Sequence, residues 1–238
     1  MFKSFELSLL HSLDPSQLPM MYAHLAILIT CYIHSIYASF ANQGPYPPSY
    51  AAFTSTFKEP AIPQVVTNFK SHLIQHKWDE NVSHIVTGYM YNSATHGLVR
   101  VDEVLDGALG SSLFDYRNAS DGSALNKQWL VGPSVGSKPT CFSERVSMPG
   151  FPLVTAGILQ TNGATFGGVV QDQWVGYAQS WDLLYGGAIS VTIYLDVKNV
   201  LLGFDFFGPG RRTKVITRFF NIMIGEIDIG VFENFPCK

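Results

Sequence analysis

The chain has 238 residues, of which 47% are hydrophobic and only 14% are charged, and its formal net charge is -3. A composition this rich in apolar residues supports a large core and excludes an intrinsically disordered chain. The one basic cluster is Arg211, Arg212 and Lys214. Because a nucleic-acid-binding surface needs a basic stripe rather than one short basic turn, the charge pattern argues against nucleic acid as a partner.

The first predicted element is an apolar segment near the N-terminus, residues 25–36. It is too short and too interrupted to span a bilayer core, which needs about 20 apolar residues. It fits the hydrophobic part of a secretory signal, and residues 39–41 supply small residues for cleavage. We therefore predict a signal peptide over residues 1–41, with Met20 or Met21 as an alternative start. An uncleaved signal anchor is the alternative interpretation, and no later apolar run approaches membrane length.

The next segment, residues 42–60, is predicted to be a proline-rich linker. Three prolines and one glycine between Asn42 and Tyr50 preclude a helix and favour extended backbone. Beyond the linker the one helical pattern is short and covers Val65–Gln75.

Alternation of apolar and polar residues dominates the rest of the chain. In Ile189–Leu195, for example, every second residue is aliphatic, which is typical of a half-buried strand. Turns rich in Gly and Pro separate the further strands that this pattern predicts, which are residues 83–91, 98–104, 129–132, 143–148, 174–185, 202–206 and 219–224. No repeat or second linker divides them, so we predict one all-β domain over residues 61–238. Its antiparallel sheets would pack as a sandwich or a strongly curved open barrel.

Several of these strands are apolar on both faces. Phe219 and Met223 alternate with Phe220 and Ile222, and Trp181 precedes two leucines and a tyrosine. Apolar residues on both faces indicate burial between sheets, a dimer interface or a lined cavity.

The cysteine count predicts a disulfide. Of three cysteines, Cys31 lies in the predicted signal, which leaves Cys141 and Cys237. A pair of cysteines in an oxidising compartment is usually bridged, whereas in the cytosol both would remain buried thiols. Two N-glycosylation triplets, at Asn81 and Asn118, agree with export.

Patterns that support catalysis are sparse. No GxSxG, P-loop or GxGxxG pattern is present in the sequence. His72 and His76 have the spacing of two helical metal ligands, but no HExxH accompanies them and surface histidines are the favoured interpretation. Asp102 and Glu103 could act as an acid/base pair or hold calcium through oxygen atoms, although solvated charges are favoured. We therefore predict that the protein is not an enzyme.

The C-terminal sequence resembles that of one protein family. Residues 217–232 read TRFFNIMIGEIDIGVF and are followed by Phe235-Pro236-Cys237. This stretch is similar to the terminal signature RFFxIxxGIxDPxVF, then proline and cysteine, of the ependymin-related proteins. Further landmarks of that family have similar counterparts in the right order, namely Tyr91-Asn92, Arg100–Glu103, Thr140-Cys141, Trp174 and Trp181–Tyr185. The resemblance covers roughly residues 62–238.

The resemblance implies a half-pipe of two curved antiparallel sheets, similar to bacterial lipoprotein-carrier folds, with a deep apolar pocket. It implies a secreted or lysosomal glycoprotein, often dimeric, associated with hydrophobic ligands, calcium and cell–matrix contacts. It also matches Cys141 and Cys237 to the family's central and terminal bridged cysteines. The sequence departs from the family in lacking a second cysteine pair, expected near residues 60–63 and near Lys198, and in having Asp228-Ile229 in place of Asp-Pro.

Together these observations predict a secreted, non-enzymatic protein that binds a fatty acid or other lipid in a concave sheet. The predicted lining residues are aromatic and aliphatic side chains of the later strands: Trp174, Trp181, Val191, Ile193, Phe204, Phe206, Phe220 and Ile222. Binding of an apolar ligand there would be driven by the apolar area removed from water. The alternative is a secreted matrix or cell-adhesion module whose apolar faces form a homodimer.

Overall fold

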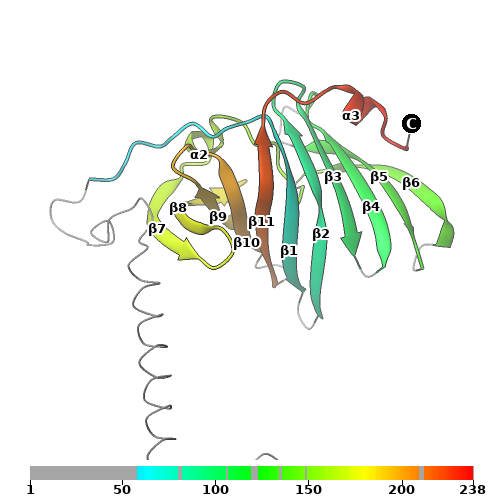
Figure 1. The fold of residues 1–238 in the computed structure, drawn as a ribbon, viewed down its shortest axis with the longest axis horizontal. Coiled ribbons are helices and arrows are strands. Elements are labelled where there is room, and N and C mark those ends of the chain that lie inside the picture. Colours follow the sequence, from blue (N-terminus) through cyan, green and yellow to red (C-terminus); the bar gives the residue numbers. More distant parts are fainter. Residues whose placement is uncertain are drawn as a thin grey trace, which may run out of the picture. The chain divides into compact units, whose positions relative to one another are not determined.

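The computed structural model describes most of the chain after the linker (Figure 1). The described residues are 58–79, 82–105, 107–118, 123–133, 136–147, 149–208 and 212–237. The predicted signal peptide, nearly all of the predicted linker and the glycosylation residue Asn81 lie outside the described residues. Within these residues, no helix is both long enough and apolar enough to cross a membrane.

Eleven antiparallel strands form a single open sheet, in the order β6-β5-β4-β3-β2-β1-β11-β10-β9-β8-β7. The strands are β1 (Phe69–Asp79), β2 (Val82–Ser93), β3 (Leu98–Leu105), β4 (Ala108–Asp115), β5 (Ala124–Gly132), β6 (Gly136–Val146), β7 (Thr165–Asp172), β8 (Gly176–Tyr185), β9 (Ile189–Leu195), β10 (Leu201–Gly208) and β11 (Thr213–Ile224). Two short helices accompany them in the described part of the chain, α2 (Ile158–Thr161) and α3 (Gly230–Glu233). The prediction of an all-β fold of strongly curved antiparallel strands is confirmed.

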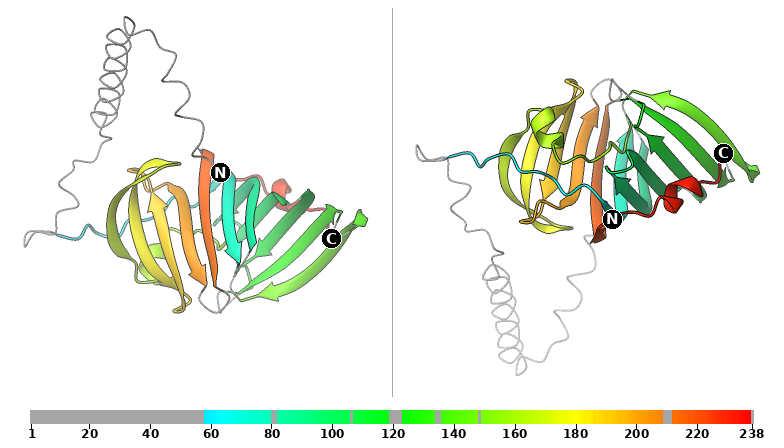
Figure 2. Two further views of the ribbon diagram at one scale, coloured as in Figure 1. Left: turned by 90° about the horizontal axis from the view of Figure 1, so that it is seen from below. Right: turned by 90° about the horizontal axis from the view of Figure 1, so that it is seen from above.

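One continuous sheet replaces the two predicted sheets because the first and last strands pair with each other. The register of β1 and β11 runs from Phe69 opposite Ile224 to Asp79 opposite Thr213. This pairing joins two meanders, β1–β6 and β7–β11, side by side (Figure 2). The curvature of the sheet then gives each face a different environment.

The predicted helix over Val65–Gln75 is wrong, because Phe69–Asp79 forms strand β1 in the middle of the sheet. Hydrogen bonding to β2 on one side and β11 on the other outweighs the local helical spacing. The same result removes the helical spacing of His72 and His76. Four residues along a strand place two side chains on the same face but about 13 Å apart, too far for both to bind one metal ion.

The larger core cluster lies on one face of the sheet, which we call the inner face. Its fully buried strand residues include Phe69, Met90, Trp181 and Phe219. Residues 149–164, which include α2, pack against this face through the buried side chains of Phe151, Val154, Ile158, Leu159 and Ala164. We call these residues the covering segment.

A single buried amide fixes the covering segment in register. The Asn92 side chain on β2 is fully buried, donates to the Val154 carbonyl oxygen at 3.0 Å and accepts from the Val154 N–H at 3.0 Å. The Val65 N–H also donates to the Ala156 carbonyl oxygen at 3.1 Å. These hydrogen bonds satisfy backbone groups that the sheet itself cannot reach.

The opposite, outer face carries a smaller core cluster. Residues 226–237, the C-terminal segment, lie on it and bury Ile227, Phe232 and Phe235 against Leu98 of β3 and Leu113 of β4. Figure 1 shows α3 of this segment beside β3 to β6. The segment ends in a disulfide between Cys237 and Cys141 of β6, whose Cα atoms are 5.7 Å apart.

Candidate functional site

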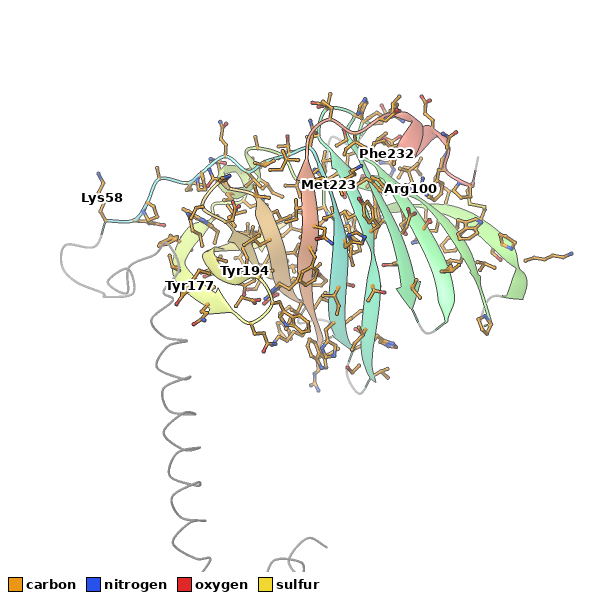
Figure 3. The ribbon with its side chains drawn as sticks, in the orientation of Figure 1. Lys58, Arg100, Tyr177, Tyr194, Met223 and Phe232 are labelled. Carbon is orange, nitrogen blue, oxygen red and sulfur yellow. A yellow bond between two sulfur atoms is a disulfide. The ribbon has the colours of Figure 1, made fainter. Side chains whose placement is uncertain are left out.

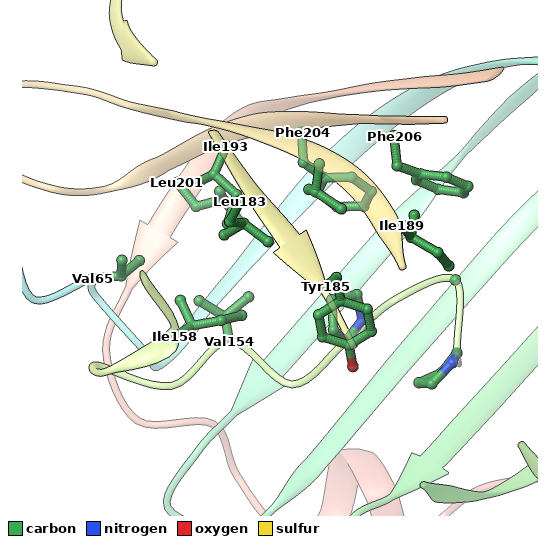
Figure 4. A pocket seen from close by; sticks show the side chains of 14 residues that line it. Val65, Val154, Ile158, Leu183, Tyr185, Ile189, Ile193, Leu201, Phe204 and Phe206 are labelled. Carbon is green, nitrogen blue, oxygen red and sulfur yellow. The ribbon is translucent and has the colours of Figure 1, made fainter. Parts of the chain in front are cut away.

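An apolar pocket lies on the inner face between the sheet and the covering segment (Figure 4). Its cavity volume is about 90 Å³. Three neighbouring strands, the covering segment and one residue before β1 line it: Val65, Pro149, Gly150, Pro152, Val154, Ile158, Leu183, Tyr185, Ile189, Val191, Ile193, Leu201, Phe204 and Phe206.

Strand register explains why the sheet side of the pocket is continuous. Val191 of β9 stands directly opposite Leu183 of β8 and Phe206 of β10. Ile193 stands opposite Phe204 in the next row of the same face. Because paired residues in antiparallel strands project to the same side, these side chains form two adjacent apolar rows.

The opposite wall is built by the covering segment. Pro149 and Pro152 line the pocket, and between them Phe151 turns into the core, where its ring centroid lies 6.3 Å from that of Phe204. The Tyr116 hydroxyl donates to the Phe151 carbonyl oxygen at 2.9 Å. This wall is therefore attached by backbone hydrogen bonds and ring contacts rather than by strand pairing.

The lining contains no charged side chain, and its one hydroxyl belongs to Tyr185. Burial raises the pKa of Tyr185 above its usual range, so the phenol is neutral at physiological pH. No other described residue forms a hydrogen bond with this hydroxyl. Figure 4 shows the Tyr185 ring among the lining side chains. The pocket can therefore bind an apolar group and offer one hydrogen bond.

Four of the eight predicted lining residues do line the pocket. They are Val191, Ile193, Phe204 and Phe206, all on β9 and β10. The other four predicted residues lie elsewhere, for two separate physical reasons.

Trp181 and Trp174 are outside the pocket because of burial and turn geometry. Trp181 is fully buried in the inner core, with its ring 5.2 Å from that of Phe166. Trp174 is 51% exposed in the turn after β7, where its backbone N–H donates to Asp172 Oδ1 at 2.8 Å. A strand over residues 174–185 was predicted, but the Asp172 turn delays the start of β8 to Gly176.

Phe220 and Ile222 are both outside the pocket, and an irregularity of β11 between them puts them on opposite faces of the sheet. Asn221 has a φ of 51°, and the pairing with β1 shifts register at this point. Phe219 is buried in the inner core, so Phe220 projects to the outer face, whereas Ile222 packs against the inner core cluster. An unbroken alternation, as the sequence suggested, would have put Phe220 and Ile222 on one face.

The covering-segment residues that line the pocket were not predicted. A loop has no periodicity that reveals which surface it will cover. Composition was the one signal that this loop is buried. Phe151, Leu153 and Val154 are apolar, whereas an exposed loop bounded by proline and glycine is usually polar.

Arg218 of β11 forms a buried ionic cluster on the outer face. Its guanidinium donates to Asp172 Oδ2 at 2.7 Å and to Asp205 Oδ1 at 2.5 Å, and it lies 4.4 Å from the ring centroid of Tyr194. The Tyr194 hydroxyl donates to Asp205 at 3.0 Å, and burial together with this carboxylate raises the pKa of Tyr194 to about 12. The cluster holds the turn that carries Trp174 against the sheet.

The remaining predicted sites are a glycosylation site and a metal site. Asn118 is exposed in the turn that follows β4, where a glycan would face water. Among the residues that the structure describes, no group of three or more His, Cys, Asp or Glu side chains is placed to hold a metal ion. Calcium binding therefore stays a prediction.

Comparisons with known proteins give only coarse similarities. No model of a known protein family matches the sequence, and no curated protein sequence is similar to it. Among solved structures, an uncharacterized conserved protein from Thermus thermophilus is 11% identical with a TM-score of 0.44, covering 72% of this chain and 86% of that one. A DUF1329 family protein from Desulfovibrio piger is 8% identical with a TM-score of 0.38, covering 71% and 90%.

A putative outer membrane lipoprotein-sorting protein domain from Vibrio parahaemolyticus is also similar, at 8% identity and a TM-score of 0.35, covering 71% of this chain and 90% of that one. TM-scores this low describe a coarse likeness of fold and carry no functional inference. None of these three structures is an ependymin-related protein, so the resemblance to that family stays a prediction.

Proposed function

We propose that this protein binds the acyl chain of a lipid in the inner-face pocket and does not act on it chemically. The observation that supports this function is the lining itself, which contains no charged side chain and has Tyr185 as its one hydroxyl. Apolar pockets with few polar groups are the usual form of small-molecule sites.

The free energy of burying methylene groups favours a flexible apolar ligand, and the pocket must widen to bind it. Each methylene group removed from water contributes about 0.8 kcal/mol. A cavity of about 90 Å³ is smaller than a long acyl chain, so such a chain requires the covering segment to move outward. That movement is feasible because this wall is not part of the sheet and is attached through Asn92 and Tyr116.

Tyr185 supports a ligand with a polar end. The Tyr185 hydroxyl is half-buried and has no hydrogen-bond partner among the described residues, so it gains a hydrogen bond when it donates to a ligand oxygen. Since no charged side chain faces the pocket, a hydroxyl or ester oxygen fits this position better than a buried carboxylate.

A tryptophan substitution at Val191 tests the proposal. Val191 is half-buried and faces the pocket, so Val191→Trp should fill the cavity and weaken binding of a fluorescent fatty-acid probe about tenfold or more. Leu184→Trp is the matched control, because Leu184 is 56% exposed and points away from the pocket. Native mass spectrometry of the purified protein should also detect bound lipid. A lipid-free protein that ignores the probe, or equal binding by both variants, would refute the function.

The predicted route of the protein is secretory, to the extracellular space or the lysosomal lumen. Its support is the predicted signal sequence together with the disulfide between Cys141 and Cys237, since disulfides persist in oxidising compartments. N-terminal sequencing of protein recovered from culture medium tests this route, and a chain that retains Met1 would contradict it.

The adhesive homodimer is the second candidate, and one surface feature supports it. Leu184 and Phe207 are 56% and 47% exposed, and both stand opposite Ser190 in one row of the outer face. Light scattering distinguishes the two candidate functions. A monomer that contains lipid favours lipid binding. A lipid-free dimer that becomes monomeric on Phe207→Ser substitution favours adhesion.

A further inference from the structure

A second and larger hollow crosses the outer face of the sheet, beside the C-terminal segment. Its cavity volume is about 630 Å³. We call it the outer groove, and its lining residues come from β1 to β5: His72, Leu73, Thr87, Gly88, Tyr89, Asp102, Glu103, Val104, Leu109, Gly110, Ser111 and Trp129. The proposed lipid pocket lies on the other face and does not share these residues.

Strand register places the central lining residues in one straight row. His72 is opposite Tyr89, Tyr89 is opposite Asp102, Asp102 is opposite Ser111, and Ser111 is opposite Trp129. Three inter-strand spacings of about 4.8 Å separate Tyr89 from Trp129, or about 14 Å in all. The row therefore has aromatic rings at both ends and a polar centre between them.

The polar centre is held in one geometry. Asp102 Oδ1 accepts from Ser111 Oγ at 2.6 Å and from Arg100 Nε at 3.0 Å. Arg100 is fixed in turn by the Val231 carbonyl oxygen at 2.6 Å and lies 5.7 Å from the ring centroid of Phe235. Figure 3 shows Arg100 and Phe232 at the end of the sheet that the C-terminal segment covers.

One oxygen of this centre is left for a ligand. No described residue donates to Asp102 Oδ2, and the Asp102 side chain is 32% exposed. Because Arg100 balances its charge, the centre is a strong hydrogen-bond acceptor without a net local charge. The same groove therefore offers an acceptor for hydroxyl groups.

The tyrosine end and the adjoining row suit the apolar side of a ligand. The Tyr89 ring is oriented by His72, whose ring meets it edge-on with centroids 4.7 Å apart. In the neighbouring row, Val104 and Leu109 are paired and are 45% and 49% exposed. The outer groove thus combines aromatic rings, exposed aliphatic side chains and a carboxylate acceptor on one open surface.

We propose that the outer groove binds a neutral saccharide. The C–H faces of sugar rings would stack on Tyr89 and Trp129, and sugar hydroxyls would donate to Asp102. A sugar matches this arrangement because one side of its ring is apolar while its edge carries hydroxyl groups. A polyanion is disfavoured because Asp102 and Glu103 line the groove and no described lysine or arginine does. An acyl chain would desolvate the Asp102 carboxylate without replacing its hydrogen bonds.

A peptide ligand fits the groove less well. The row lies in the middle of the sheet, where the backbone of each strand is already paired, so strand addition at an edge cannot occur there. A proline-rich peptide could still use aromatic rings, and it serves as the competing ligand in the test.

The experiment titrates the full chain, as secreted, with cellobiose, maltose, lactose and chitobiose, observed by saturation-transfer NMR and calorimetry. At least one disaccharide should bind, and Tyr89→Ala and Asp102→Asn should each weaken it about tenfold or more. Asn at position 102 keeps an oxygen for Ser111 and Arg100 but replaces the ligand-facing acceptor with a donor. Tyr177→Ala, on β8 and outside the groove, is the control and should bind normally (Figure 3).

Three outcomes would overturn the proposal. They are the absence of binding by all four sugars, undiminished binding by both groove variants, and binding of a polyproline peptide in place of sugar. Fatty-acid binding should be unchanged in Tyr89→Ala, because the inner pocket lies on the other face. Failure of the lipid function therefore leaves the saccharide result unaffected, and the two proposals can be judged separately.

Discussion

The two faces of the sheet are covered in different ways. On the inner face, the covering segment contributes a run of buried apolar side chains to a core that already contains Phe69, Trp181 and Phe219. On the outer face, the C-terminal segment buries fewer residues and depends on individual links, which are the disulfide at Cys237 and the hydrogen bond from Arg100. Stability is therefore distributed on the inner face and concentrated at a few atoms on the outer face.

This difference explains how one sheet can accommodate two kinds of site. A face covered mainly by many weak apolar contacts can rearrange around a ligand, because most of its contacts are individually small. A face whose covering segment is held by a disulfide and a hydrogen bond keeps its polar groups in fixed positions, which suits recognition by directed hydrogen bonds. Substitutions at the links should thus have larger effects than their area of contact suggests.

The largest expected effect is that of Cys237→Ser. The disulfide joins cysteines 96 residues apart, so its loss should lower the free energy of unfolding by about 4–5 kcal/mol through the greater entropy of the unfolded chain. Chemical denaturation measures the change. A reducing agent should destabilise the wild-type protein by a similar amount and leave the variant unaffected. An unchanged unfolding midpoint would show that the disulfide is not needed to hold the C-terminal segment.

The next largest effect should come from Arg218→Met. This side chain is 4% exposed, and its removal leaves the partly buried carboxylates of Asp172 and Asp205 without their cation. Breaking a buried ion pair in this way typically costs about 3 kcal/mol or more. The double variant with Asp172→Asn should recover part of the loss, measured by the same denaturation. Additive losses would mean that the two residues do not interact.

A smaller effect, which depends on pH, is expected at Asp172. Burial opposes ionisation of its carboxyl, but hydrogen bonds from Arg218 and from the Trp174 and Val175 N–H groups outweigh burial and lower the pKa. Because the folded-state pKa is below the unfolded value of about 3.9, Asp172 stabilises the protein above that pH and loses this contribution as pH falls through the folded-state pKa. Asp172→Asn should therefore destabilise the protein near neutral pH and much less in strong acid. A difference that is constant over this range would exclude the linkage.

Local alternation was sufficient to predict much of the sheet. The predicted strands at 83–91, 98–104 and 189–195 correspond to β2, β3 and β9, and the common face of Val191 and Ile193 followed from strict periodicity. Strand β1 was missed because one of its two neighbours in the sheet is β11, which is distant in the sequence.

Other features depend on irregularities and long-range contacts that no local sequence pattern predicts. The irregularity at Asn221 reverses the faces of the residues that follow it, so Phe220 and Ile222 do not share the face that the alternation predicted. The ion pair of Arg218 with Asp172 joins residues 46 positions apart, so neither sequence neighbourhood reveals it. The outer groove was missed for the same reason, because its central row takes one residue from each of five strands.

The smallest expected effect tests whether burial makes an ion pair more stabilising. It compares the exposed pair of Arg117 with the buried pairs of Arg218. Arg117 donates to both oxygens of Asp115, at 2.6 and 3.0 Å, but its side chain is 58% exposed. Exposed pairs contribute about 0.2–1 kcal/mol, so Arg117→Gln should change the free energy of unfolding far less than Arg218→Met.

Salt provides the control for this comparison. Screening at about 1 M NaCl should abolish the small effect of Arg117→Gln and leave that of Arg218→Met nearly intact, because buried charges are screened much less. Both arginines form short bonds to aspartate, so the geometry of the two sites is similar and their surroundings differ. If the two substitutions cost the same at low salt, burial does not explain the strength of the Arg218 ion pair.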